Sequence, residues 1–92
     1  MKAMILNIKP GNLLDEDEFN EFQNMISSRV ETGVDFKVDM GETIGMNLSK
    51  FNTLVKLYIS LRRAGKNLEY SNLQEVVLRY VEKTNFDHVF TR

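Results

Sequence analysis

The sequence predicts a small α/β domain in which helices pack on a mostly parallel sheet. Two observations lead to this prediction. Each short apolar or alternating segment is followed by a segment whose apolar residues recur at helical spacing. Each connection is also long enough to cross over to a parallel neighbouring strand. We therefore expect the element order βαβαβα with right-handed crossovers, in a single domain that spans all 92 residues.

The first strand and helix are predicted in the N-terminal third of the chain. The apolar residues of Ala3–Ile8 are nearly continuous, so we expect this strand to be buried on both faces. Asp15 and Glu18 have the spacing of a capping box, which starts a helix that Gly33 would end. The apolar residues at helical spacing are Phe19, Phe22, Ile26 and Val30, with Met25 beside them.

The second strand and helix follow immediately. Apolar and charged residues alternate strictly in Val34–Met40, which is typical of a strand with one buried face. The loop of residues 41–45 holds two glycines, and Asn47 or Ser49 would cap the next helix, which basic residues and a glycine end at residues 62–65. The apolar face of this helix comprises Leu48, Phe51, Leu54, Val55, Tyr58 and Leu61. Such a junction between a strand and a helix is where open α/β sheets present their binding surfaces.

The third strand and helix are shorter. Leu68–Tyr70 is predicted as a strand, and Asn72 with Glu75 three residues later as the start of a helix. The apolar face of this helix comprises Leu73, Val76, Val77, Tyr80 and Val81. Phe86–Phe90 is predicted to close the chain as a short strand or an extended tail.

Composition excludes several classes of function. Without cysteine, the chain has no disulfide, no thiolate zinc site and no cysteine nucleophile. A net charge of −1 with scattered basic residues argues against nucleic-acid binding. The N-terminal apolar run is too short for a signal peptide or a membrane span. We therefore expect a cytoplasmic protein that binds neither nucleic acid nor membrane.

The residue types that carry catalysis do not form a motif. Gly41–Gly45 suggests a phosphate loop, but the Lys-Ser/Thr pair that should follow its last glycine is missing. His88 has no neighbouring serine or cysteine, and Asp35 and Asp39 belong to the outer face of the alternating strand. A small hydrolase or transferase would need a nucleophile and a base, and no such pair can be named. The sequence thus predicts a non-catalytic protein without cofactor or metal.

Four segments carry a resemblance to a known family. Residues 47–51 and 57–66 resemble the central loop and helix of a STAS domain, the fold of bacterial anti-sigma factor antagonists. Gly11–Leu14 resembles the Gly-Glu-Leu-Asp turn of that family, and Lys83–Phe90 resembles its closing segment. The resemblance covers nearly the whole chain, except that Ala3–Ile8 matches the strand directly before the turn and the usual first strand is missing. It implies a small STAS-like α/β fold and a regulatory protein-binding role.

The resemblance also implies how partner binding is switched in the family. A kinase-like anti-sigma factor phosphorylates a serine in an Asp-Ser-Ser-Gly-Leu motif. Here Asn47 stands in place of the aspartate, Leu48 in place of the phosphorylated serine and Ser49 in place of the second serine. Leu14 likewise replaces the aspartate of the turn. Because Leu48 has no hydroxyl group, we expect constitutive binding, with any remaining phosphorylation at Ser49.

We expect the partner-binding site in the loop and helix start from Thr43 to Asn52. Leu48 and Met46 would be its apolar contacts, with Leu48 at least partly exposed. The remaining residues of the site are polar: Thr43, Asn47, Ser49, Lys50 and Asn52. The partner expected from the resemblance is an anti-sigma factor, and the alternative is that the chain is an accessory subunit of a transporter complex. The missing first strand would leave an open sheet edge, which predicts a homodimer.

Overall fold

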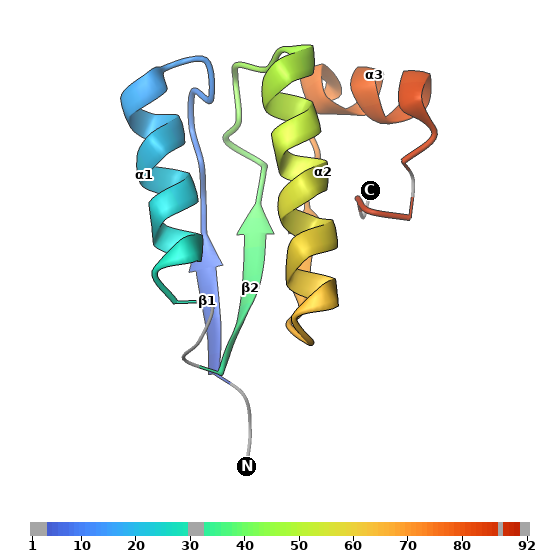
Figure 1. Cartoon of the computed structure of the whole chain (residues 1–92). Coiled ribbons are helices and arrows are strands. Elements are labelled where there is room, and N and C mark those ends of the chain that lie inside the picture. The colour runs from blue at the N-terminus through green and yellow to red at the C-terminus, as the bar shows by residue number, and fades with distance from the viewer. Residues whose placement is uncertain (1–3, 30–32, 87, 91–92) are drawn as a thin grey trace.

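A computed structural model describes residues 4–29, 33–86 and 88–90 as a three-stranded parallel sheet with three helices (Figure 1). The elements in chain order are β1 (Met4–Ile8), α1 (Glu16–Ser27), β2 (Val34–Asp39), α2 (Leu48–Arg63), β3 (Leu68–Ser71) and α3 (Glu75–Thr84). The strands lie in the order β1-β2-β3, and both pairings are parallel. The predicted α/β fold and its βαβαβα order are confirmed.

The sheet has one face covered by helices and one polar face. The helices α1 and α2 lie side by side on the same face (Figure 1). Phe36 and Val38 of β2 point to this face and are buried, whereas Lys37 between them is exposed. In β3, Tyr70 is buried and Glu69 is exposed in the same way. The alternation read from the sequence therefore gives the orientation of these two strands correctly.

Aromatic rings hold α2, α3 and the end of the chain together. The ring of Phe51 stacks on those of Tyr80 and Phe90, at centroid distances of 5.6 and 5.1 Å. Phe90 also stacks on Tyr70 at 4.9 Å and pairs with it through an isolated parallel bridge. The end of the chain thus forms neither the strand nor the simple extended tail predicted, because the N–H of Val89 donates to the carbonyl of Phe86 in a turn.

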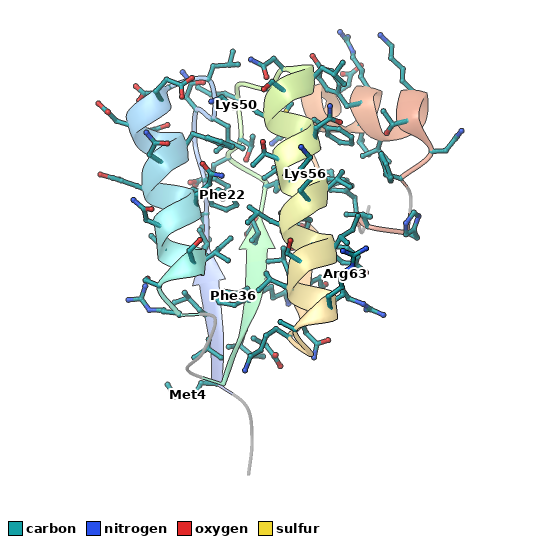
Figure 2. All side chains as sticks on the ribbon, in the orientation of Figure 1. Met4, Phe22, Phe36, Lys50, Lys56 and Arg63 are labelled. Carbon is teal, nitrogen blue, oxygen red and sulfur yellow. The ribbon has the colours of Figure 1, made fainter. Side chains whose placement is uncertain are left out.

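The prediction that the first strand is buried on both faces is wrong. β1 is an edge strand of the sheet, and Met4 and Ile5 are 75% and 60% exposed, whereas Ile8 is buried. Met4 lies beyond the end of α1, so this helix covers only the carboxyl half of β1 (Figure 2). The apolar residues of β1 therefore belong to an edge strand of which α1 covers only one half. The predicted first residue of the strand, Ala3, lies outside the described residues.

The start of α1 agrees with the predicted N-cap. Oδ1 of Asp15 accepts hydrogen bonds from the N–H groups of Asp17 and Glu18, at 2.9 and 3.2 Å. The carboxylate of Glu18 accepts from the N–H of Asn12 at 2.7 Å, so it ties the preceding loop to the helix. The helix ends at Ser27, before the predicted Gly33. Its buried residues are Phe19, Phe22 and Ile26, whereas Val30 lies outside the described residues.

The predicted start of α3 at Asn72 is also wrong. Gln74 occupies the N-cap position, and its side chain makes no capping hydrogen bond. Asn72 has a positive φ of 55° and donates a hydrogen bond to Asp39 instead. The helix ends at Thr84, and the next residue, Asn85, adopts the left-handed conformation common after a helix.

Candidate functional site

Two loops at the carboxyl ends of β1 and β2 form one unit. The hydroxyl of Thr43 is buried and donates to the carbonyl of Pro10 at 3.0 Å. The N–H of Ile44 donates to the carbonyl of Gly11 at 3.3 Å. These contacts join segments more than thirty positions apart and fix the second loop on the first. The surface that the loops present is therefore held by backbone contacts rather than by side chains alone.

Gly45 allows the two loops to approach closely. It pairs with Asn12 through an isolated parallel bridge. A Cβ atom at Gly45 would lie 2.1 Å from Oδ1 of Asn12 and 3.1 Å from Cγ of Leu14. The same Oδ1 accepts a hydrogen bond from the N–H of Leu14 at 3.1 Å, which sets the turn before α1. A side chain at this position would therefore displace that of Asn12 from the turn.

The start of α2 is anchored to the start of α1. Asn47 caps α2, because its Oδ1 accepts from the N–H of Lys50 at 2.8 Å. The Nζ of Lys50 binds both carboxylate oxygens of Glu16, at 2.8 and 2.9 Å, and lies 4.1 Å from the ring centroid of Phe19. Figure 2 shows Lys50 at the start of α2 on the side of α1. Its side chain is only 12% exposed, so Lys50 joins the two helices.

Three exposed apolar side chains belong to the segments that meet at this junction. Leu14 is 46% exposed, Ile44 76% and Leu48 54%. They come from the turn before α1, from the loop after β2 and from the first residue of α2. The polar side chains beside Leu48 are also exposed: Asn47, Ser49 and Asn52. We call these six residues the loop-end surface.

The structure separates the predicted site residues into two groups. The expected exposure of Leu48 is confirmed. Met46 and Thr43, in contrast, are 6% and 1% exposed, so neither side chain is available as the direct contact that was predicted. Met46 belongs to the apolar core, and the Thr43 hydroxyl is used within the loop unit. Lys50 is held by Glu16 and is mostly covered.

Sequence reasoning missed the contact surface offered by Leu14 and Ile44. Leu14 follows Leu13 in the turn before α1, and Ile44 stands between Thr43 and Gly45 in the loop after β2. Neither position belongs to a periodic pattern, so no local signal gives its exposure.

A second polar network lies at the carboxyl ends of β2 and β3. Oδ1 of Asp39 accepts from the N–H of Gly41 at 2.9 Å and from the side-chain amide of Asn72 at 3.1 Å. The side-chain amide of Gln74 donates to the carbonyl of Gly41. The hydrogen bonds from Gly41 and Asn72 hold the pKa of the Asp39 carboxyl below its ordinary value. Asp39 therefore helps to fix the loop after β2.

The two other candidate catalytic residues, Asp35 and His88, lie beside groups that belong to the fold itself. Oδ1 of Asp35 accepts from the N–H of Asn67 at 3.4 Å, and the exposed His88 lies 6.0 Å from the ring of Phe86. Over residues 4–29, 33–86 and 88–90, no group of three His, Asp or Glu side chains is placed to hold a metal ion. In the same part of the chain, no helix combines the length and apolar character needed to cross a membrane.

Comparison with known proteins gives no match: no family model, no curated protein and no solved structure is similar to the chain.

Proposed function

We propose that this chain is a non-catalytic protein-binding module of the anti-sigma factor antagonist type, with a STAS-like fold. The loop-end surface is its contact site. The observation that carries the proposal is the exposure of Leu14, Ile44 and Leu48 around a junction whose backbone is fixed. Large apolar side chains on such a preorganised surface are suitable anchors for a protein partner.

The rigidity of the surface supports this proposal. The hydrogen bond from Thr43 to Pro10 and the ion pair between Lys50 and Glu16 hold the loop and the helix start before a partner arrives. A preorganised site loses less conformational entropy on binding than a mobile loop. Met46 and Lys50 contribute by this support, whereas Ile44 and Leu48 would make the contacts.

The experiment is affinity capture from lysate of the native cell, with the wild-type chain and two single variants as baits. Leu48→Asp places a charge on the loop-end surface at a position where the side chain is already 54% exposed. Ile59→Asp is the matched control, because Ile59 is a 40% exposed apolar residue of the same helix but lies outside that surface. Mass spectrometry then identifies the proteins that each bait retains.

The proposal requires one protein to be retained by the wild type and by Ile59→Asp but lost with Leu48→Asp. If that protein is an anti-sigma factor, the proposed role holds. If it is a transporter subunit, the accessory-subunit role replaces it while the binding site stands. Equal retention by all three baits would show that the loop-end surface is not the contact site.

We further propose that binding does not depend on phosphorylation. Leu48 cannot accept phosphate, and the neighbouring Ser49 points about 100° away around the helix axis. Incubation with the captured partner and ATP, followed by intact-mass measurement, should leave the mass unchanged. Stoichiometric phosphorylation that disappears in Ser49→Ala would overturn the constitutive mode.

A further inference from the structure

The free edge of β1 lacks the features that usually block strand addition. β1 pairs with β2 on one side only, and among the described residues no strand pairs with its other side. The five residues Met4–Ile8 include no charged residue and no proline. Edge strands in monomeric proteins are commonly protected by such residues, by bulges or by a covering segment. This edge, with Ile5 60% exposed, is open to another strand.

The register of the sheet shows which backbone groups face this edge. The N–H of Phe36 donates to the carbonyl of Asn67 at 2.9 Å, so the backbone of Phe36 points to β3. Backbone groups alternate sides along a strand, so Asp35 points to β1, where it is in register with Ile5. In a parallel pair the N–H and C=O groups of Asp35 form hydrogen bonds with Met4 and Leu6, the residues on either side of Ile5. The N–H and C=O groups of Ile5 itself, and of Asn7, therefore point outward.

We propose that β1 pairs antiparallel with β1 of a second copy of this chain, with the two-fold axis at Leu6. In that register Ile5 stands opposite Asn7 of the second copy, and Asn7 opposite its Ile5. Both are hydrogen-bonded pairs, in which all outward N–H and C=O groups of the two strands are used. Leu6 faces its own copy, and Met4 faces Ile8. No charged residues stand opposite each other in this register, so two copies of β1 are compatible as neighbouring strands.

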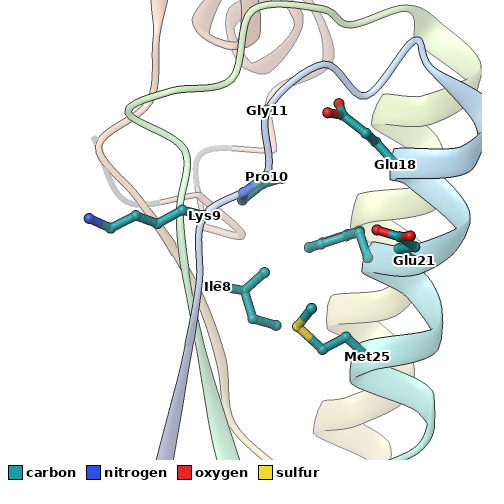
Figure 3. A pocket seen from close by; sticks show the side chains of 8 residues that line it. Ile8, Lys9, Pro10, Gly11, Glu18, Glu21 and Met25 are labelled. Carbon is teal, nitrogen blue, oxygen red and sulfur yellow. The ribbon is translucent and has the colours of Figure 1, made fainter.

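A groove beside the edge of β1 is a second reason to expect that the partner is another copy of this chain. Ile8, Phe22 and Met25 supply the apolar part of a groove of about 170 Å³ between β1 and α1, which Glu18 and Glu21 also line, and Ile8 and Met25 face each other across it (Figure 3). Met4, which is 75% exposed, would lie opposite Ile8 of the second copy and cover this groove. The exposed apolar side chain and the groove that it fits are thus both supplied by the same chain. The net charge of −1 gives little repulsion between copies.

Light scattering coupled to size-exclusion chromatography, from micromolar to millimolar concentration, tests the proposal together with three variants. Asn7→Pro removes an outward N–H at an edge position, where proline is tolerated in a monomer. Asn7→Thr keeps the N–H and is the matched control. Met4→Asp places a negative charge against the groove of the other copy, which Glu18 and Glu21 also line. We expect the wild type and Asn7→Thr to reach twice the chain mass, and the dissociation constants of Asn7→Pro and Met4→Asp to rise roughly ten- to a hundred-fold.

Amide hydrogen exchange decides the test if Asn7→Pro fails to fold. In the wild-type dimer the amides of Ile5 and Asn7 should exchange slowly, and dilution to the monomer should make them fast. A wild-type chain that remains monomeric at every concentration overturns the proposal. A dimer in which these two amides still exchange rapidly overturns it as well, because the copies would then meet elsewhere. Leu48→Asp should dimerise as the wild type does, which separates this interface from the loop-end surface.

Discussion

Replacing Gly45 with alanine should destabilise the protein, because the added Cβ would lie 2.1 Å from Oδ1 of Asn12. The Asn12 side chain has to move, which loses its hydrogen bond from the N–H of Leu14, a change of about 0.5–1.5 kcal/mol. The contact with Cγ of Leu14 at 3.1 Å adds about 1 kcal/mol, the lower end of the overpacking range, because Leu14 is 46% exposed and can shift. The lower entropy of the unfolded alanine chain offsets about 0.4–1 kcal/mol. We therefore expect a net loss of about 0.5–2 kcal/mol.

Urea unfolding followed by circular dichroism measures this loss, and Gly11→Ala is the control. A Cβ at Gly11 would meet nothing closer than the Glu18 carboxylate at 3.6 Å, so this variant should remain within about 0.5 kcal/mol of the wild type. Adding Asn12→Ala to Gly45→Ala should cost little more, since the hydrogen bond from the N–H of Leu14 is already lost in Gly45→Ala. Equal stability of Gly45→Ala and the wild type, or a double variant as unstable as the sum of the two single ones, would refute the reasoning.

Three further predictions concern the groups that fix the helices and the loop. Lys50→Met should lower the free energy of unfolding by about 1 kcal/mol, and a double-mutant cycle with Glu16→Gln should give a coupling of about 0.5 kcal/mol, because Glu16 is 71% exposed. Tyr70→Phe should cost about 0.5–1.5 kcal/mol in urea unfolding, because the buried hydroxyl donates to the carbonyl of Leu54 at 2.8 Å; a neutral effect would contradict that role. The pKa of Asp39 is lower in the folded than in the unfolded protein, so its carboxylate adds to the free energy of unfolding above the ordinary pKa of 3.8 and this contribution disappears as the pH falls below that value. Asp39→Asn should therefore make the midpoint of urea unfolding less sensitive to acid. An unchanged pH profile would contradict this prediction.

Local patterns in the sequence are sufficient to predict most of the elements. The spacing of Phe19, Phe22 and Ile26 gives the buried face of α1, and the alternation of Phe36 and Val38 gives the buried face of β2. Both patterns arise because each element packs on one side only, so the spacing of its apolar residues shows which side faces the core.

The features that sequence reasoning did not predict depend on contacts between distant segments. The exposure of Met4 follows from the strand order and from where α1 ends, and neither is visible in a continuous apolar run. Met46 is buried because the loop after β2 folds back on the loop after β1. Lys50 becomes a link between helices only when Glu16, 34 positions away, is placed beside it. The sequence therefore indicates a segment for the candidate site, whereas the exposure and contacts of its side chains depend on the fold.

The most direct test of the proposed function is isothermal titration calorimetry of the captured partner against the purified chain and its variants. Binding that depends on the loop-end surface predicts that Leu48→Asp and Ile44→Asp each weaken the affinity by about 30-fold or more, the range of an interface anchor. Ile59→Asp should remain within about two-fold of the wild type, since surface positions outside an interface contribute little. Equal dissociation constants for the wild type, Leu48→Asp and Ile44→Asp would contradict the proposal that this surface binds the partner.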